Sequence, residues 1–193
     1  CTSANRIYVQ RGISEAFIAE MTKSMSSFVM GRGTDATTTL GASVSMKERN
    51  KIAQIVDESV AAGATVKVGG VKPEGDGAFY PATVLIVDKD NPILLHEIFG
   101  PVAPIIIFDT DEEGIKLAND TEFGLISYVF SSNLTRALRT AEAMESGMVA
   151  INKGVISDPA APFGGVKQSG LGREGGFDGI HEFLQTKYIG VEI

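Results

Sequence analysis

The chain has 193 residues, of which 44% are hydrophobic and 21% are charged, and its formal net charge is −7. This is the composition of an ordinary globular domain, and a chain of this length buries about 70% of the surface that it exposes when unfolded. An acidic balance without a Lys- or Arg-rich run argues against nucleic acid and against anionic membranes as partners. With one cysteine and two histidines in the sequence, an intramolecular disulfide is excluded and no metal site is expected.

The sequence also bears on where the protein is found. Its apolar runs are far shorter than a membrane span, and no signal peptide is visible, so we expect a cytoplasmic protein. Because the sequence opens on Cys1 rather than on Met, we also expect it to be a fragment.

The first part of the chain predicts a strand followed by a helix. Residues 7–10 (Ile-Tyr-Val-Gln) are typical of a strand. Ser14 is a candidate N-cap for a helix that runs to about Val29, with apolar residues at helical spacing. The Ser-, Gly- and Thr-rich stretch 31–45 has neither period and predicts a loop.

A second helix is predicted after Ser45, because Ser45 and Glu48 have the spacing of a capping box. Gly63 is expected to end this helix. Strands are then predicted over 65–68, 80–87 and 102–108. The last of these strands is continuously apolar, as a buried strand would be, but Pro104 places it at an edge or a bulge.

The second part of the chain alternates helices and strands. They are predicted in the order helix 111–119, strand 126–130, helix 134–145 and strand 148–152. This alternation implies a layered α/β fold with parallel strand pairs. A long loop rich in Gly, Pro and Ser runs from Lys153 to Gly176, and a short helix is expected near 179–184. The last six residues alternate like a strand that has no later partner in the sequence.

Three stretches carry residues suited to chemistry. Cys1 is a lone thiol on a short polar loop, where it could be a nucleophile or a small buried hydrophobe. Glu97 could accept two hydroxyl hydrogen bonds, as from a ribose, beside the flat ring of Phe99; the alternative is a turn with an exposed Glu and a core Phe. The glycines of 162–176 allow a close backbone approach. No strand feeds directly into them, so a phosphate-binding role is not expected, and a flexible surface loop is the alternative.

Five motifs follow one another in a fixed order. They are a Cys five residues before an Arg that leads into a strand, Glu-x-Phe-Gly-Pro at 97–101, Asn-Asp-Thr-Glu-Phe-Gly-Leu at 119–125, Gly-Met-Val-Ala-Ile-Asn at 147–152, and Pro-Phe-Gly-Gly with Ser-Gly-x-Gly-Arg-Glu within 162–174. In this order and spacing they resemble the aldehyde dehydrogenase superfamily over essentially the whole chain. The resemblance implies a three-layer α/β catalytic domain with a mostly parallel sheet over residues 1–176. It further implies a C-terminal helix and oligomerisation arm over 177–193.

The resemblance implies a role for each matched residue. Cys1 matches the catalytic nucleophile, whose thiolate attacks the aldehyde carbon; the adduct loses hydride to a nicotinamide, and the resulting thioester is hydrolysed. Glu97 matches the carboxylate that holds the nicotinamide ribose, and Phe99 the side chain beside that ring. Asn152 matches an asparagine at the end of an active-site strand, and Phe163 matches a wall of the aldehyde pocket.

Within the superfamily the chain most resembles the succinate-semialdehyde dehydrogenases. This likeness rests on Cys-x-x-Ala-Asn-Arg at the start, on Ile156-Ser157, and on the run Gly-Val-Lys-Gln-Ser-Gly-Leu-Gly-Arg-Glu-Gly. In that group the serine matching Ser157 binds the distal carboxylate of the substrate; an ordinary loop hydroxyl is the alternative. The arginines expected to grip the same carboxylate would lie before residue 1.

The resemblance also implies partners and missing parts. The cofactor would be NAD or NADP, chosen by a dinucleotide-binding domain upstream, which would also supply the general-base Glu and an oxyanion-hole Asn. The 193 residues alone are therefore expected not to oxidise aldehydes. A homodimer or homotetramer is expected to form through the C-terminal strand. Ser3 stands where some relatives carry a second cysteine, so a disulfide switch with Cys1 is not expected.

Two other functions stay open at this point. The chain could belong to an enzyme for another aldehyde, such as glutarate semialdehyde, or to one of broad range. It could instead be a non-catalytic oligomerisation fragment whose Cys1 is inert.

Overall fold

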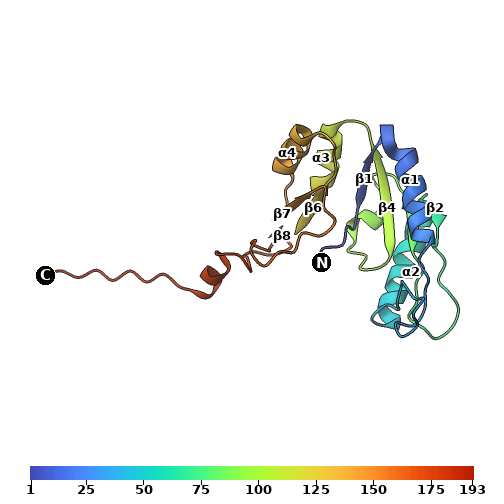
Figure 1. Ribbon diagram of the computed structural model, residues 1–193, viewed down its shortest axis with the longest axis horizontal. Coiled ribbons are helices and arrows are strands. Elements are labelled where there is room, and N and C mark those ends of the chain that lie inside the picture. Colours follow the sequence, from blue (N-terminus) through green and yellow to red (C-terminus); the bar gives the residue numbers. More distant parts are fainter. The chain divides into compact units, whose positions relative to one another are not determined.

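A four-stranded sheet in the order β1-β4-β3-β2 is the framework of the first part of the chain in the computed structural model, which describes all 193 residues (Figure 1). The strands are β1 (Ile7–Gln10), β4 (Val102–Phe108), β3 (Thr83–Ile86) and β2 (Thr65–Val68). The β1/β4 and β3/β4 pairs are parallel, and the β2/β3 pair is antiparallel. The prediction of an α/β fold with a mostly parallel sheet is therefore confirmed.

Two long helices cover the two faces of this sheet. Helix α1 (Arg11–Ser26) packs on a cluster that includes Ala103 and Ile105 of β4. Helix α2 (Met46–Ala61) packs on a cluster that includes Val102 and Ile106 of the same strand. Because the side chains of a strand alternate between its two faces, the helices lie on opposite faces and the fold has three layers.

Helices α1 and α2 begin in different ways. At α2, the Ser45 hydroxyl accepts a hydrogen bond from the Glu48 N–H at 3.2 Å, which confirms this half of the predicted capping box, and Gly63 follows the helix with a φ of 100°. Helix α1 begins at Arg11, directly after β1, rather than at Ser14. The Ser14 hydroxyl instead donates to the Arg11 carbonyl at 2.9 Å inside the first turn, so the predicted cap at Ser14 is wrong.

The prediction that Pro104 lies at an edge is met only locally. Strand β4 is central rather than at an edge, and Pro104 is fully buried and pairs with Leu85 of β3. The ladder between β1 and β4 starts only at the Ile7 and Ile105 pair, one residue after the proline. Pro104 therefore occupies a position where β4 has a strand partner on one side, which accommodates the missing N–H.

The remaining helices and strands are short. In chain order they are η1 (Pro92–Leu95), α3 (Asp111–Asn119), β5 (Phe123–Gly124), β6 (Ile126–Val129), α4 (Leu134–Ala143), β7 (Met148–Ile151), β8 (Val166–Lys167) and η2 (Gly179–Phe183). Strands β6 and β7 pair in parallel, and β5 and β8 pair antiparallel. The part of the chain from 184 to 193 forms no helix or strand and runs out in an extended conformation (Figure 1).

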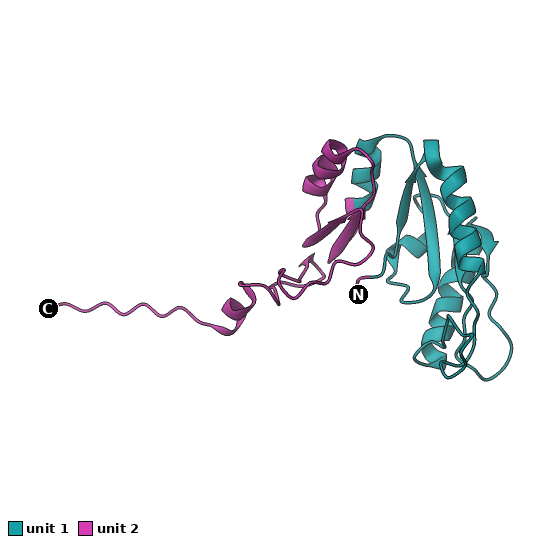
Figure 2. Cartoon of the chain, viewed as in Figure 1, with its two compact units in different colours: residues 1, 3–118 teal, residues 2, 119–193 magenta.

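The chain divides into two compact units between Ala118 and Asn119 (Figure 2). Thr2 belongs with the second unit, where its carbonyl accepts a hydrogen bond from the Tyr128 hydroxyl at 2.6 Å. The predicted division after Gly176, into a catalytic domain and an arm, stays a prediction. None of the helices is both long and apolar enough to cross a lipid bilayer.

Candidate functional site

The loop that carries Cys1 is joined to the Glu97 segment by one side chain, that of Asn5. The Asn5 amide nitrogen donates to the His96 carbonyl, and the Asn5 amide oxygen accepts from the Ile98 N–H at 3.0 Å. These two peptide groups flank Glu97, and all of these residues belong to the first unit. The structure therefore connects the loop of one candidate site residue, Cys1, to the segment of another, Glu97.

The exposure of these residues bears on the alternatives left open by the sequence. Cys1 is exposed with a free thiol, so it is not a buried hydrophobe. Glu97 is exposed, and Phe99, two residues further on, is 66% exposed rather than part of the core. The side chain between them, Ile98, is buried at 1% exposure and anchors this segment in the hydrophobic core.

Several contacts hold the backbone around Glu97 in place. They fix the point from which the Glu97 side chain extends. The Lys51 ammonium, on α2, donates to the Glu97 carbonyl at 3.3 Å. Phe99 has a φ of 53°, in the left-handed region that side chains other than Gly rarely adopt. Gly100 packs so closely on Ile52 that an added Cβ would lie 2.5 Å from the Ile52 Cδ1.

The exposed carboxylate and exposed ring suit the nicotinamide end of a dinucleotide. Glu97 can accept two hydrogen bonds from adjacent ribose hydroxyls, because an ionised carboxylate offers acceptors on both oxygens. The flat ring of Phe99 can lie against a planar heterocycle. The residues present therefore fit this half of the cofactor.

The other three candidate residues lie in the second unit. Asn152 follows β7 with a φ of 53°, and its amide bonds both the N–H and the carbonyl of Ser131 at 2.9 Å each. Its side chain therefore closes the end of the β6/β7 pair. Ser157 is exposed in the long loop. Phe163 is half-buried, and its N–H and carbonyl pair with Glu174 in an antiparallel bridge.

Phe163 also lines an open cavity of about 370 Å³ within the second unit. The lining residues come from one stretch of loop and the segments beside it: Leu125, Phe163, Gly164, Gly165, Ser169, Leu171, Gly172, Arg173, Glu174 and Glu182. The Arg173 guanidinium is turned toward backbone, because it donates to the carbonyls of Gly165 and Gly172 at 2.7 Å each.

The glycines of the long loop serve backbone packing. A Cβ at Gly147 would lie 2.1 Å from the Gly164 carbonyl oxygen, and a Cβ at Gly164 would lie 2.4 Å from the Gly172 carbonyl oxygen. Three backbone segments of the second unit thus pack against one another without side chains between them. This packing accounts for the glycines at 147 and 164, where a side chain would collide with backbone.

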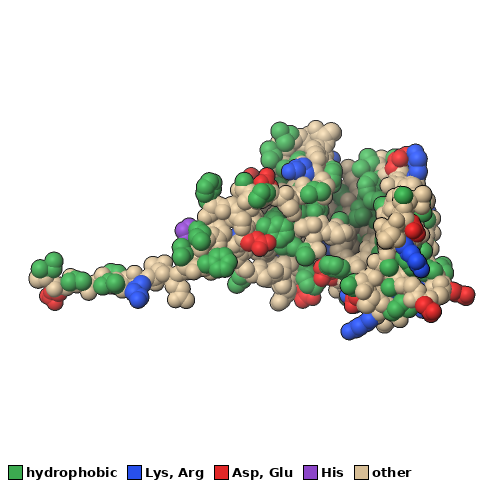
Figure 3. Space-filling view, turned by 60° about the horizontal axis from the view of Figure 1, so that its bottom comes forward, with side chains coloured by type: hydrophobic (Ala, Val, Ile, Leu, Met, Phe, Trp, Pro, Cys, Tyr) green, Lys and Arg blue, Asp and Glu red, His purple; other side chains and the backbone are tan.

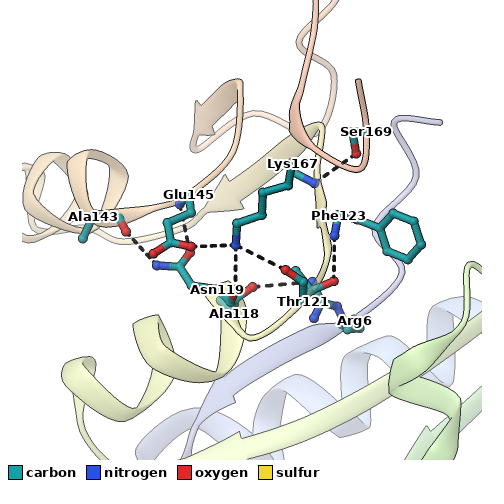
Figure 4. A network of polar contacts seen from close by, with 10 residues as sticks. Arg6, Ala118, Asn119, Thr121, Phe123, Ala143, Glu145, Lys167 and Ser169 are labelled. Carbon is teal, nitrogen blue, oxygen red and sulfur yellow. Dashed lines mark hydrogen bonds and ion pairs between the residues drawn. The ribbon is translucent and has the colours of Figure 1, made fainter. Parts of the chain in front are cut away.

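Lys167 ties this loop to two other segments of the second unit (Figure 4). Its ammonium contacts a Glu145 carboxylate oxygen at 2.6 Å and donates to the carbonyls of Asn119 at 2.9 Å and Thr121 at 3.2 Å. The Asn119 amide in turn bonds the Ala143 carbonyl and the Glu145 N–H. Lys167 is therefore a structural lysine, and its φ of 55° is held in place by these contacts.

The aldehyde dehydrogenase family model matches residues 1–189. The chain belongs to the aldehyde dehydrogenase family. The resemblance of the five motifs is thereby confirmed.

Aldehyde dehydrogenases of several substrate classes are similar to this chain. A succinate-semialdehyde dehydrogenase of Paenarthrobacter nicotinovorans is 47% identical over 99% of the chain, and a glutarate-semialdehyde dehydrogenase of Pseudomonas putida is 42% identical over all of it. A crystal structure of a betaine aldehyde dehydrogenase of Staphylococcus aureus, in complex with NAD⁺, superposes on 96% of the chain with a TM-score of 0.90 at 39% identity. The aldehyde dehydrogenase fold is therefore shown.

The chain spans about two fifths of the length of these relatives. It covers 43% of the Paenarthrobacter enzyme, 40% of the Pseudomonas enzyme and 38% of the Staphylococcus structure.

Neither Asn5 nor Lys51 carries a local sequence signal for a role at the site. Asn5 stood in the motif only as a match, and no local pattern indicates that its amide would contact residues about ninety positions further on. Lys51 lies on α2 among other charged residues, and its contact with the Glu97 carbonyl is likewise long-range. The position of Asn5, four residues after Cys1, could have suggested a polar residue in the Cys1 loop. It does not indicate which residues the Asn5 amide contacts.

Proposed function

We propose that this chain is the catalytic half of an aldehyde dehydrogenase that uses NAD or NADP to oxidise a semialdehyde to the corresponding acid. The observation that carries the proposal is the Asn5 side chain, which connects the loop of an exposed thiol to the segment of an exposed carboxylate. Membership of the family supports the reaction class. A bound nicotinamide would supply the hydride acceptor.

Cys1 acts as the nucleophile in the proposed reaction. Its thiolate attacks the carbonyl carbon and forms a C–S bond, while the carbonyl oxygen becomes the oxygen of a thiohemiacetal. Loss of hydride from that carbon leaves a thioester on Cys1. Water then adds to the thioester, the C–S bond breaks, and the acid leaves. The aldehyde is thereby oxidised by two electrons, and a water molecule supplies the second carboxylate oxygen.

Glu97 and Phe99 hold the hydride acceptor in this proposal. Glu97 accepts hydrogen bonds from the ribose hydroxyls, and Phe99 limits the space beside the ring. The NAD⁺ in the complex of the Staphylococcus relative supports a nicotinamide cofactor. We leave the choice between NAD and NADP open, because it depends on contacts at the adenine end of the cofactor.

Three residues of the second unit are assigned to the aldehyde side. Phe163 would form a wall for the substrate, and Ser157 would donate a hydrogen bond to its distal carboxylate. Asn152 would keep the end of β7 in place through Ser131, since its amide is already engaged there. The semialdehyde dehydrogenases among the relatives support a substrate with a distal carboxylate, with succinate semialdehyde as the first choice and glutarate semialdehyde as the second.

We propose that the extended stretch 188–193 adds a strand to a second copy of the chain, giving a homodimer or homotetramer, because its apolar side chains are exposed and its backbone has no partner strand.

The test is an assay of the full-length enzyme that contains this chain. The wild type is expected to reduce NAD⁺ or NADP⁺ with succinate semialdehyde, and Cys1→Ser is expected to lower kcat by roughly 10⁴-fold or more. Iodoacetamide should inactivate the wild type near neutral pH, with protection by substrate. An enzyme that keeps its turnover in Cys1→Ser, or that never labels at Cys1, would contradict the proposal and favour an inert oligomerisation fragment.

The substrate assignment needs a separate comparison. Ser157→Ala should raise KM for succinate semialdehyde by about tenfold, the value of one hydrogen bond to a charged group, and leave KM for butanal unchanged. Equal effects on both aldehydes would mean that Ser157 does not bind the distal carboxylate. The 193-residue chain alone is expected to show no turnover.

A further inference from the structure

The side-chain amide of Asn5 joins two segments that are far apart in the sequence. We infer that Asn5 is a positioning residue, which sets the place of the Glu97 carboxylate relative to the loop of Cys1 and so governs how tightly the nicotinamide ribose is held. The inference rests on the proposed function of Glu97. It adds a residue in contact with neither substrate nor cofactor, which acts through the backbone on both sides of Glu97.

The chemistry of the contact requires an amide. The His96 carbonyl needs a donor and the Ile98 N–H needs an acceptor, and a single Asn amide offers one of each. The backbone at His96 is extended, with φ of −113° and ψ of 143°. In an extended segment the carbonyl of one residue and the N–H of the residue two positions on face the same side. Asn5 therefore takes the place of a neighbouring strand at this point.

Glu97 is held from the opposite side as well. In an extended segment its own carbonyl faces away from Asn5, and the Lys51 ammonium donates to that carbonyl at 3.3 Å. The next side chain, Ile98, is buried in the core. The Glu97 backbone is thus fixed on both edges, and only the side-chain torsions of Glu97 remain free to reach a ribose.

Asn5 can fix the Glu97 segment relative to Cys1 because the loop that carries Asn5 is short. Only three residues separate it from Cys1, and the strand β1 begins two residues after it. Removal of the amide would leave the His96 carbonyl and the Ile98 N–H without their partner and would let the segment shift relative to β1. Asp at this position keeps the acceptor for Ile98 but cannot donate to His96, and it adds a negative charge beside the carboxylate of Glu97.

The experiment measures dinucleotide binding to the full-length enzyme, without turnover. Dissociation constants for NAD⁺, NADP⁺ and ADP would be determined by calorimetry for the wild type, Asn5→Ala, Asn5→Asp, Glu97→Gln and the double variant Asn5→Ala/Glu97→Gln. ADP lacks the ribose that Glu97 is proposed to hold, so it reports on folding and on the rest of the cofactor site. Ser3→Ala is the matched control, an exposed hydroxyl on the same loop.

We expect Asn5→Ala and Asn5→Asp each to weaken binding of the preferred dinucleotide by roughly tenfold, with ADP binding and Ser3→Ala unchanged. The double variant should bind no more weakly than Glu97→Gln alone, because both changes remove the same interaction. Loss of ADP binding in parallel, full additivity in the double variant, or unchanged binding in both Asn5 variants would overturn the inference. If the wild type binds neither NAD⁺ nor NADP⁺, the proposed function itself fails, and the two failures are distinguishable.

Discussion

At the scale of single residues, left-handed backbone coincides with candidate site positions. The non-glycine residues with positive φ are Phe99, Asn152 and Lys167, with values of 53°, 53° and 55°. Two of them, Phe99 and Asn152, match in the sequence motifs a residue beside the cofactor and an asparagine at the end of an active-site strand. Such conformations cost about 1 to 3 kcal/mol each and persist where surrounding contacts enforce them. The Ser131 contacts at Asn152 and the contacts of the Lys167 ammonium are of this kind.

Tyr80 offers a residue-scale prediction with a defined pH window. It is 1% exposed, and its hydroxyl has no hydrogen-bond partner. Burial, with a further contribution from the charge of Asp57, raises the pKa of Tyr80 to about 12, and the nearby Thr83 hydroxyl opposes the shift. The folded pKa lies above the ordinary value of 10.0. The raised pKa of Tyr80 therefore lowers the free energy of unfolding only at alkaline pH. Stability is intact below pH 10 and is lost as pH rises from 10 through about 12.

Tyr80→Phe should remove this loss of stability at alkaline pH. At neutral pH we expect the free energy of unfolding to stay the same or to rise by about 1 kcal/mol, since an unpaired buried hydroxyl is removed. Urea unfolding near neutral pH and at about pH 11 checks both expectations. A Tyr80→Phe variant that loses stability at alkaline pH as the wild type does would contradict the assignment.

At the scale of elements, the glycine contacts of the second unit give the sharpest test. Gly147→Ala would place a methyl group 2.1 Å from the Gly164 carbonyl, so the Pro-Phe-Gly-Gly corner has to move. We expect a loss of about 3 kcal/mol in stability, the upper end of the usual effect of overpacking. Gly154→Ala is the matched control, because a Cβ there meets no atom within 4 Å.

Hydrogen exchange followed by mass spectrometry localises the effect. Peptides over 163–172 should exchange faster in Gly147→Ala than in the wild type, whereas Gly154→Ala should match the wild type. Equal exchange in both variants would mean that the corner does not depend on the close approach of Gly147.

Elements with a local signal were predictable from the sequence, and those set by distant contacts were not. The hydrogen bond from the Glu48 N–H to Ser45, the position of Gly63 just past the end of α2, and the bounds of α3 agree with the sequence analysis, because capping and helical spacing act over a few residues. The start of α1 was not predictable, because that helix continues directly from β1. The place of Pro104 depends on where β1 begins to pair, which only the assembled sheet determines.

The candidate site was predictable in part. The residue types at Cys1, Glu97 and Phe99 indicated a nucleophile and a ribose site through their motifs, and the structure adds their exposure. The Asn5 contact with the Glu97 segment was not predictable, because it joins positions that are far apart in sequence and has no periodic pattern. The same holds for the engagement of the Asn152 amide by Ser131.

At the scale of the whole molecule, the extended C-terminal stretch is the feature without an internal partner. Tyr188, Ile189 and Val191 are 91%, 74% and 78% exposed, and the stretch carries hydrophobic side chains along its length (Figure 3). In an extended conformation Ile189, Val191 and Ile193 share one face. An apolar face of this kind on an unpaired strand favours addition to another sheet.

Val191→Asp should therefore weaken the proposed oligomer. A charge in the middle of the apolar face would be buried against the second copy, which is strongly unfavourable without a partner charge. Light scattering of the full-length enzyme should show a smaller assembly for Val191→Asp, and the wild-type assembly for the neighbouring control Glu192→Gln. An unchanged mass for Val191→Asp would exclude this stretch from the interface.

The pairing of β1 with β4 has a consequence for the timing of synthesis. Ile7 finds its sheet partner only at Ile105, and the Asn5 amide finds its partners only at His96 and Ile98. During translation these partners leave the ribosome long after Cys1 does, and closing so long a loop is a slow step in folding. The sulfur therefore spends the early life of each molecule on a segment that is not yet anchored, open to oxidants and electrophiles. Damage at this stage would block the thiol that we propose as the nucleophile.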